Sequence, residues 1–407
     1  MGEIGGRSTR LLAAGLIALA IGTALVLVYV LANTGAAGIL GDLAIYRGAI
    51  RHALAGGDLY DWAYSHPTVH GLGFTYPPFA ALVLLPAALL DSRVAEVLWT
   101  ASTFGALLFC LFFLVQRSPR SPSGRLPRDR TVQWAWVTGL ALPAMVSAPF
   151  LHNLVVGQVS VFLVALVLLD LALPKRWQGA LVGLAAAIKL TPLVFLPFFL
   201  VTGQWRRAAN LGGVFLAAAA LALVILPQAS VTYWTDKLWR TERVGRLDST
   251  VNKSLLGFLS RELPVGVPLM FAWVLVGIAV TLVAFWSAAR YTAKGGELPA
   301  TLILGVLSVA LSPISWPHHM LWLVIAACWC FVGVRSRIGA ILGAVLFVAL
   351  LATPWYGDHA AGSLEPALRV GSELPALAPL LVLGWGLLPG LRLSSARGAG
   401  RGGADDD

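Results

Sequence analysis

The chain has 407 residues, of which 58% are hydrophobic and only 12% are charged, and its formal net charge is +10. Soluble domains carry about a quarter charged residues, so this composition excludes an ordinary soluble enzyme and indicates a protein that crosses a membrane many times. The cysteines, Cys110, Cys328 and Cys330, lie in apolar runs and form neither a disulfide framework nor a zinc motif.

Apolar runs recur along the whole chain, and we predict twelve spans. The predicted spans are residues 11–32, 94–116, 131–149, 156–173, 178–190, 191–202, 208–227, 266–289, 298–312, 319–334, 338–354 and 375–391. We expect the first to be a retained span and not a cleaved signal peptide. The pair 178–190 and 191–202 is short, and Thr191-Pro192 marks a break, since proline cannot continue a helix. Segment 77–90 is also short, so we expect it to lie at the interface or re-enter.

Clusters of arginine and lysine decide the orientation, because positive residues are enriched in cytoplasmic loops. With both chain ends in the cytosol, one set of basic clusters falls on the inner side: those at 7–10, 117–130, 175–176, 206–207, 290–294, 335–337 and 392–401. The segments that then lie outside are 33–93, 150–155, 228–265, 313–318 and 355–374. We therefore predict one membrane domain over residues 1–391, with the outer loops 33–93 and 228–265 forming its active-site face, and a disordered cytosolic tail over 392–407.

Both long outer loops contain helical patterns. In 43–55, apolar residues recur on one face and Arg47 and Arg51 lie on the other, which predicts a helix lying on the membrane surface. The apolar face comprises Tyr46, Ala49, Ile50, Ala53 and Leu54. In the second loop, basic residues recur at steps of three, which predicts one basic stripe along a helix. These residues are Lys237, Arg240, Arg243 and Arg246.

Asp42 is the first candidate for chemistry, since it directly follows the first span and precedes the surface helix. One interpretation is an N-cap, which accepts hydrogen bonds from the first helical turn. The other is a carboxylate that acts as general base toward a hydroxyl at the outer membrane surface. Position alone does not decide between them. Asp58 and Asp61 stand in GGDLYDW, where turn chemistry is favoured.

Polar residues at other predicted helix ends are weaker candidates. Asn153 and Gln158 lie in HNLVVGQ, and their amides are able to hold sugar hydroxyls. Lys189 is a charged residue inside a predicted span, so it either faces a polar cavity or extends to the inner interface. Tyr76 precedes two prolines, which start a helix or shape a pocket wall.

The stretch SPISWPHH, residues 312–319, joins two predicted spans on the outer side. Adjacent histidines point in different directions on a helix, and no carboxylate is near in sequence, so we predict no metal site. Contact of His318 and His319 with phosphate or sugar is the better functional interpretation. Trp316 is either part of that contact or an interfacial anchor.

Taken together, six motifs resemble glycosyltransferase family 87, and they occur in order over nearly the whole chain. They are GDLAIY (41–46), FTYPPF (74–79), GQ (157–158), IKLTP (188–192), SLLG (254–257) and SPISWPHH (312–319). The resemblance implies an all-α polytopic membrane protein of the GT-C type, with about twelve transmembrane helices and periplasmic surface helices. It also implies a polyprenol-phosphate-mannose-dependent α-mannosyltransferase of the cell membrane, whose active site lies on the outer face.

Carried onto this sequence, the resemblance implies a reaction that inverts at C1 in a single displacement, with Asp42 as general base. The acceptor would be a cell-envelope glycolipid or lipoglycan, joined through an α-1,2 linkage. No cofactor is expected beyond the lipid-linked sugar, and no nucleic-acid partner. Donor phosphate is assigned to Arg47, Lys189, His318 and His319. The substrate pocket is assigned to Tyr46, Tyr76, Asn153, Gln158, Ser254 and Trp316.

Other functions fit the same composition. A transporter or flippase of a lipid-linked sugar would explain the broken helix and the intramembrane lysine, although the chain shows no repeated halves. An arabinosyl- or glucosyltransferase of the same fold would share the motifs. A membrane protein without chemistry would tolerate alanine at Asp42.

Overall fold

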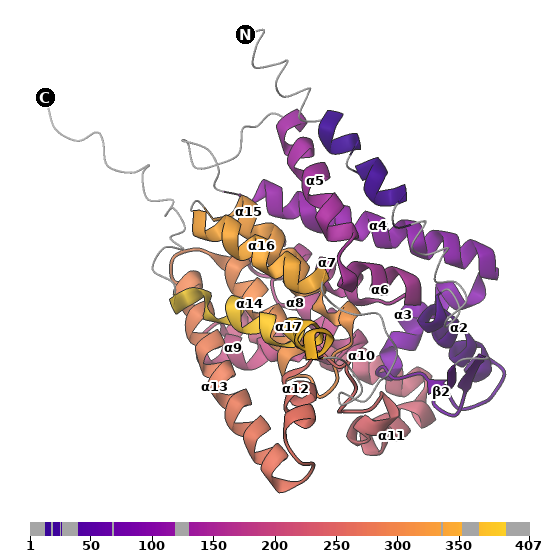
Figure 1. The fold of residues 1–407 in the computed structure, drawn as a ribbon. Coiled ribbons are helices and arrows are strands. Elements are labelled where there is room, and N and C mark those ends of the chain that lie inside the picture. Colours follow the sequence, from indigo (N-terminus) through magenta and orange to yellow (C-terminus); the bar gives the residue numbers. More distant parts are fainter. Residues whose placement is uncertain are drawn as a thin grey trace, which may run out of the picture.

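The computed structural model describes residues 13–17, 19–24, 26, 40–66, 69–118, 130–334, 337–351 and 366–387. The predicted disordered tail, 392–407, lies outside these residues, and so do parts of the first span and of the outer segment 355–374. In Figure 1, α2, β2 and α11 lie together on one side of a helical bundle, and α13 runs along another edge.

The described part of the chain is almost entirely helical, as the sequence predicts. Its first elements are α2 (Gly41–Leu54), β1 (Ala63–His66), β2 (Val69–Gly73), α3 (Pro78–Leu89), α4 (Ser92–Gln116), α5 (Arg130–Met145), α6 (Ala148–Val156) and α7 (Ser160–Asp170). The middle elements are α8 (Ala180–Ile188), η1 (Thr191–Val194), α9 (Phe195–Val201), α10 (Trp205–Ile225), α11 (Pro227–Thr235), η2 (Lys237–Trp239), η3 (Thr241–Arg243) and α12 (Leu255–Glu262). The last are α13 (Val267–Thr292), α14 (Glu297–Leu311), η4 (Pro317–Met320), α15 (Leu321–Val332), α16 (Arg337–Leu351), α17 (Pro366–Leu383) and η6 (Gly384–Leu387). The strands β1 and β2 form a small antiparallel hairpin.

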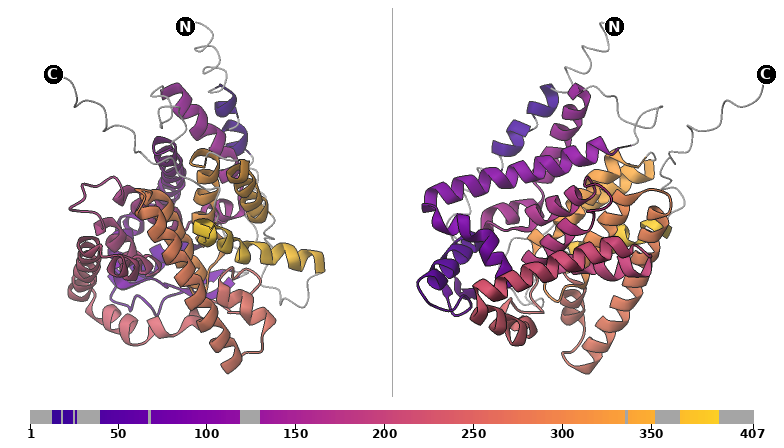
Figure 2. Two further views of the ribbon diagram at one scale, coloured as in Figure 1. Left: turned by 90° about the vertical axis from the view of Figure 1, so that its left-hand side faces the viewer. Right: turned by 180° about the vertical axis from the view of Figure 1, so that it is seen from behind.

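Three described helices, α4, α10 and α13, are long and apolar enough to cross a bilayer by themselves. Large apolar side chains on α13 face outward, with Phe271 65% and Leu282 66% exposed, as expected of a surface that contacts lipid. The ribbon of α13 runs along an edge of the bundle (Figure 2). A fourth span results if α5 and α6, which meet at a 75° bend, count as one. The prediction of about twelve transmembrane helices is thus not confirmed, although the fold is that of a helical membrane protein.

The bend between α5 and α6 corrects the predicted span 131–149. The first helix ends at Met145, and a new one begins at Ala148 with a proline in its first turn. Proline fixes a helical φ and lacks the N–H that a continuous helix would use, so it is well placed to start a helix in a new direction. Residues 150–155 are therefore helical and largely buried, where an outer loop was predicted.

The short pair 178–190 and 191–202 behaves as predicted. Helix α8 ends before Lys189, whose backbone is extended (φ −147°, ψ 126°), and η1 and α9 follow after Thr191-Pro192. The chain then returns to where it started, because the Arg207 guanidinium donates a hydrogen bond to the Gln178 side chain. The break at Lys189 is therefore the tip of a helical hairpin.

The bundle has two polar ends. At one, Arg117 donates to the Leu171 carbonyl at 2.9 Å, and Arg207 forms an ion pair with Glu297 at 2.9 Å. Helices α7, α8 and α14 each have one terminus near this end. Their other termini adjoin Gln158, Lys189 and Ser312, which line a common cavity at the opposite end.

The first outer surface pattern is confirmed in part, because α2 forms and Tyr46, Ala49 and Ile50 are buried while Arg51 is exposed; the second is wrong. Helix α2 exists, but it packs against α3 and buries Arg47 (6% exposed), while Leu54 is 60% exposed. The segment with the basic step of three forms two short 3₁₀ turns, η2 and η3, and not one helix. Periodicity predicts a single continuous surface, and it fails where a neighbouring segment covers part of the polar face, as at Arg47, or where the chain turns.

Candidate active site

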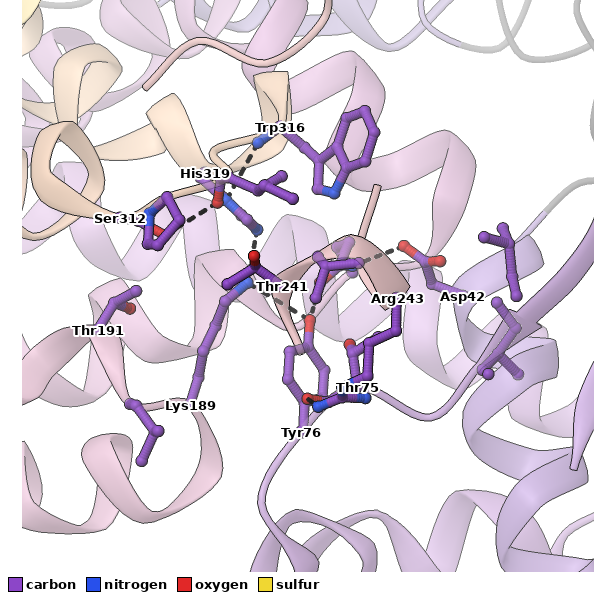
Figure 3. Close-up of a pocket in the computed structure, with 18 of the residues that line it drawn as sticks. Asp42, Thr75, Tyr76, Lys189, Thr191, Thr241, Arg243, Ser312, Trp316 and His319 are labelled. Carbon is purple, nitrogen blue, oxygen red and sulfur yellow. Dashed lines mark hydrogen bonds between the residues drawn. The ribbon is translucent and has the colours of Figure 1, made fainter. Parts of the chain in front are cut away.

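A cavity of about 540 Å³ lies at the second polar end of the bundle. Its walls come from segments far apart in sequence: α2, the connection between β2 and α3, the α6–α7 junction, the α8–η1 break, the loop after α11, and residues 312–319. Figure 3 shows Lys189 and Tyr76 approaching His319, with Asp42 on another side of the same cavity. The predicted outer loops 33–93 and 228–265 both contribute residues to this lining.

The start of α2 is fixed against the end of α6. The Leu40 N–H donates to the Val155 carbonyl at 2.7 Å, and Leu40 adopts a left-handed conformation (φ 59°) to do so. Gly157 is also left-handed (φ 74°), and a Cβ there would lie 3.0 Å from the Leu43 Cβ. Glycine is favoured at such a position because, without a Cβ, it adopts a positive φ at no steric cost and does not collide with Leu43. The contact brings Gln158 beside Asp42.

Asp42 is hydrogen-bonded through its side chain and does not cap the helix, since Leu40 occupies the N-cap position. The Gln158 amide nitrogen donates to the carboxylate at 2.6 Å. The Gln158 oxygen accepts from the Tyr76 hydroxyl at 2.6 Å, and the Tyr46 hydroxyl lies 3.2 Å from that of Tyr76. One line of hydrogen bonds thus joins the carboxylate to the aromatic wall.

Burial raises the pKa of Asp42 to about 6, because the charged form loses its hydration. The hydrogen bond from Gln158 and the charge of Lys189 oppose this rise. A carboxyl group with a pKa near 6 is ionised at neutral pH and yet basic enough to accept a proton in a reaction. Burial likewise raises the pKa of Tyr76, so its hydroxyl stays protonated as a donor.

Basic groups gather opposite Asp42. The Lys189 ammonium lies 2.5 Å from Nε2 of His319 and 5.0 Å from the centre of the Tyr76 ring. His319 accepts at Nδ1 from the Trp316 backbone N–H at 3.2 Å. His318 contacts His319 edge to face, with ring centres 4.4 Å apart. It also stacks on His152, with the two Nδ1 atoms 2.8 Å apart.

The lining of the cavity therefore has more basic than acidic side chains. Among its lining residues, Asp42 holds the single carboxylate, whereas the basic members are Lys189, Lys237, Arg240, Arg243, His152, His318 and His319. The buried Nε2 of His318 has no hydrogen-bond partner among the described residues. Such a surplus of buried donors and cations favours an anionic ligand with oxygen acceptors.

The structure brings together eight of the eleven residues assigned from sequence. Lining the one cavity are Asp42, Tyr46, Tyr76, Gln158, Lys189, Trp316, His318 and His319. Sequence reasoning did not assign His152, Tyr233, Lys237, Arg240 or Arg243 to the site. The step of three among the basic residues was the available signal, but it was interpreted as a helical stripe.

Three assignments are wrong as cavity residues. The Arg47 guanidinium donates to the carbonyls of Ser92 at 3.1 Å and Leu90 at 2.9 Å, so it stabilises the α3–α4 connection. Ser254 caps α12 through the Gly257 N–H at 2.9 Å. Asn153 is fully buried outside the cavity lining. Asp58 has the expected turn role, accepting from the Tyr60 N–H at 2.8 Å.

Comparison with known proteins identifies the family to which the chain is similar. Residues 74–313 match the model of Glycosyltransferase family 87. A polyprenol-phosphate-mannose-dependent alpha-(1-2)-phosphatidylinositol pentamannoside mannosyltransferase of Mycolicibacterium smegmatis is 35% identical over 358 residues, 84% of each chain. A polyprenol-phosphate-mannose-dependent alpha-(1-2)-phosphatidylinositol mannoside mannosyltransferase of Mycobacterium tuberculosis is 32% identical, over 70% of this chain and 68% of the relative.

The role of Arg47 can be tested by Arg47→Met. Losing its hydrogen bonds to the α3–α4 connection should lower the free energy of unfolding by about 2 kcal/mol, since charge-assisted bonds are removed and carbonyls are left unpaired. Thermal unfolding of the purified protein in detergent measures the effect. The matched control, Arg246→Met, alters an exposed arginine and should leave Tm near that of the wild type. An unchanged Tm in Arg47→Met would contradict the structural role.

Proposed function

The chain belongs to glycosyltransferase family 87, and from this premise we propose that it transfers mannose from polyprenyl-phosphate-mannose to a phosphatidylinositol mannoside. It is a membrane glycosyltransferase, and the names of its relatives support both the lipid-phosphate donor and an α-1,2 linkage. The observation that carries the proposal is one cavity in which a carboxylate with a raised pKa lies across from Lys189, His318 and His319.

The cationic side suits the donor. The lipid phosphate is the leaving group, so negative charge grows on its oxygens as the bond between C1 of mannose and the phosphate oxygen breaks. Lys189 and His319 provide fixed positive or donating groups, and His318 has an unpaired buried nitrogen beside them. Preorganised donors in a water-poor cavity stabilise such developing charge strongly. The substrate phosphate would in turn relieve the excess positive charge of the cavity.

The carboxylate suits the acceptor. Asp42 removes the proton from the attacking hydroxyl while the acceptor oxygen bonds to C1 and the lipid phosphate departs from the opposite face. The proton ends on Asp42, and the electron pair of the broken bond stays with the phosphate. A β-linked donor then gives an α-mannoside by inversion. The Gln158 hydrogen bond holds the carboxylate in place and favours its ionised form.

We also propose that this cavity opens on the outer face of the cell membrane. The arginine-bearing termini of α4 and α10 lie at the other end of the bundle, near Gln178 and Glu297, which the positive-inside tendency places in the cytosol. Helix α3 has only 12 residues, about 18 Å, too short to cross a core of about 30 Å. Other described helices are equally short, such as α7 with 11 residues and α15 with 12, and α15 is lengthened by η4, which directly precedes it. We propose about twelve crossings built in this way within one domain over residues 1–391.

The base can be tested by Asp42→Asn. This change preserves shape but removes the ability to accept a proton, so mannosyl transfer should fall by about a hundredfold or more. Donor binding and thermal stability should stay close to those of the wild type. Transfer is measured with purified protein, a synthetic polyprenyl-phosphate-mannose and a phosphatidylinositol mannoside. Near-normal activity of the variant would rule Asp42 out as the base.

The pH profile tests the same group independently. Because the reactive form is the ionised carboxylate, kcat/KM should rise with pH through about 6. Gln158→Leu removes a hydrogen bond that stabilises the ionised form, so the pKa of Asp42 should increase and the inflection should move to higher pH. A profile whose inflection stays fixed, or moves to lower pH, would contradict this role of Gln158.

The orientation can be tested with single introduced cysteines, since the three native cysteines are buried. Lys175 and Glu242 are both exposed, at opposite ends of the bundle. In intact cells, a membrane-impermeant maleimide should modify Glu242→Cys, and it should modify Lys175→Cys only after permeabilisation. The reverse pattern would place the cavity in the cytosol.

A further inference from the structure

One segment contacts both walls of the cavity. Residues 236–254, which we call the strap, follow α11 and lead into α12. The strap contributes lining residues of its own, among them Thr241, Arg243 and Val251. Its remaining contacts reach the segment before Tyr76 on one side and residues 313–316 on the other. The family resemblance assigned no role to this segment beyond its last residue.

Arg243 is the first anchor of the strap. Each of its three guanidinium nitrogens donates to a backbone carbonyl: Nε to Lys237 at 2.7 Å, one terminal nitrogen to Phe74 at 3.1 Å, and the other to Thr75 at 3.0 Å. The guanidinium also lies beside the stacked rings of Tyr60 and Tyr233, 6.0 and 5.9 Å from their centres. An arginine held this way is a cross-link between two loops, and its charge is already used by the protein.

The anchored carbonyls directly precede Tyr76. The Tyr60 hydroxyl adds a hydrogen bond to the Tyr76 carbonyl at 2.8 Å. The backbone of Tyr76 is thereby fixed, and its hydroxyl is the donor that orients the Gln158 amide toward Asp42. Because the Tyr76 hydroxyl binds the Gln158 amide oxygen, the amide nitrogen on the other side of the group points toward the Asp42 carboxylate. Arg243 therefore acts on the carboxylate through two intermediate side chains.

Asn252 is the second anchor, and it is fully buried. Its amide nitrogen donates to the carbonyls of Leu247 at 3.0 Å and Pro313 at 3.1 Å. Its oxygen accepts from the N–H groups of Ser254 at 3.2 Å and Ser315 at 2.9 Å. These four bonds use both donors and both acceptor positions of the side chain. No other residue type of this size offers two donors and two acceptors.

The second anchor fixes the histidine side of the cavity. The Lys253 N–H donates to the Ser315 carbonyl at 2.6 Å. The Trp316 ring covers Gly245 so closely that a Cβ there would lie 2.6 Å from a ring atom. The Trp316 backbone N–H in turn donates to His319. The strap thus holds the segment that orients the imidazole beside Lys189.

We propose that the strap aligns the two halves of the catalytic cavity, with Arg243 positioning the Tyr76–Gln158–Asp42 line and Asn252 positioning Trp316 and His319. Neither residue touches a reacting atom, so both are positioning residues. The proposal rests on the proposed mannosyl transfer, because its tests measure the pH dependence of that transfer and the KM for the mannose donor. It predicts that substitution of Arg243 shifts the pH dependence of transfer, whereas substitution of Asn252 raises the KM for the donor.

The first arm uses Arg243→Lys, which keeps the charge but cannot reach three carbonyls. Tyr76 should loosen and Gln158 should lose its orientation, so the inflection of kcat/KM should move to higher pH, as in Gln158→Leu. The charged or titratable groups that face Asp42 are Lys189, Tyr46 and Tyr76, and Arg243→Lys changes none of them. The double variant Arg243→Lys/Gln158→Leu should show no larger shift than Gln158→Leu alone, since both act along one line.

The second arm uses Asn252→Ala. It should raise the donor KM by roughly fivefold to tenfold, a ratio typical of one lost hydrogen bond, and leave the pH inflection in place. The matched control is Arg246→Gln, which alters an exposed strap residue paired with Asp248 and should change neither quantity. If an anchor variant does not fold, Tyr60→Phe removes the hydrogen bond to the Tyr76 carbonyl, and Ser254→Ala removes the one to the Pro313 carbonyl together with the cap of α12.

The proposal is overturned if Arg243→Lys reduces transfer without moving the inflection, or if its shift adds fully to that of Gln158→Leu. It is also overturned if Asn252→Ala lowers kcat alone with the donor KM unchanged. A wild-type profile without any inflection near pH 6 would instead contradict Asp42 as the base. That outcome is distinguishable, because it is seen before any strap variant is made.

Discussion

The hydrogen bond between Gln158 and Asp42 is the contact on which the rest of the cavity depends. It forms because the left-handed residues Leu40 and Gly157 bring the start of α2 against the end of α6. Through Tyr76 the same line reaches Lys189, whose ammonium lies 3.5 Å from the tyrosine hydroxyl. A carboxylate and a cation are thus held in one cavity, yet kept apart by neutral hydrogen-bonding groups. A direct ion pair would have neutralised both.

Charge balance explains why such a cavity suits a phosphate-linked donor. Lys237 and Arg240 pair with Asp236, and Arg243 donates to three backbone carbonyls. Among the described residues, Lys189 is the lining cation with neither an ion pair nor a carbonyl partner, and such a cation is costly in a desolvated site. An anionic substrate restores the balance when it binds, so part of its binding free energy comes from relieving an unfavourable arrangement. The same excess favours the charge that grows on the leaving phosphate, which is the requirement for catalysis and not only for binding.

Local patterns in the sequence predicted the helices and the motifs near the cavity, but not which loops meet. Asp42, Lys189 and His319 were identified because charged or titratable residues at span ends are unusual in an apolar chain. Arg47 was misassigned because periodicity marked its face as solvent-exposed, whereas α3 covers that face and its terminal carbonyls need donors. Arg243 was missed for the converse reason: its partners, Phe74 and Thr75, are about 170 residues away and are backbone carbonyls, which no side-chain pattern reveals.

The central claim is that mannose is transferred from a lipid phosphate with inversion at C1. The most direct measurement gives the purified protein a synthetic β-linked polyprenyl-phosphate-mannose and a phosphatidylinositol mannoside, then determines the product by mass spectrometry and its anomeric configuration by NMR. The account predicts one added mannose in α linkage and release of polyprenyl phosphate. A β-linked product, or mannose transfer that occurs only with a nucleotide-linked donor, would contradict it.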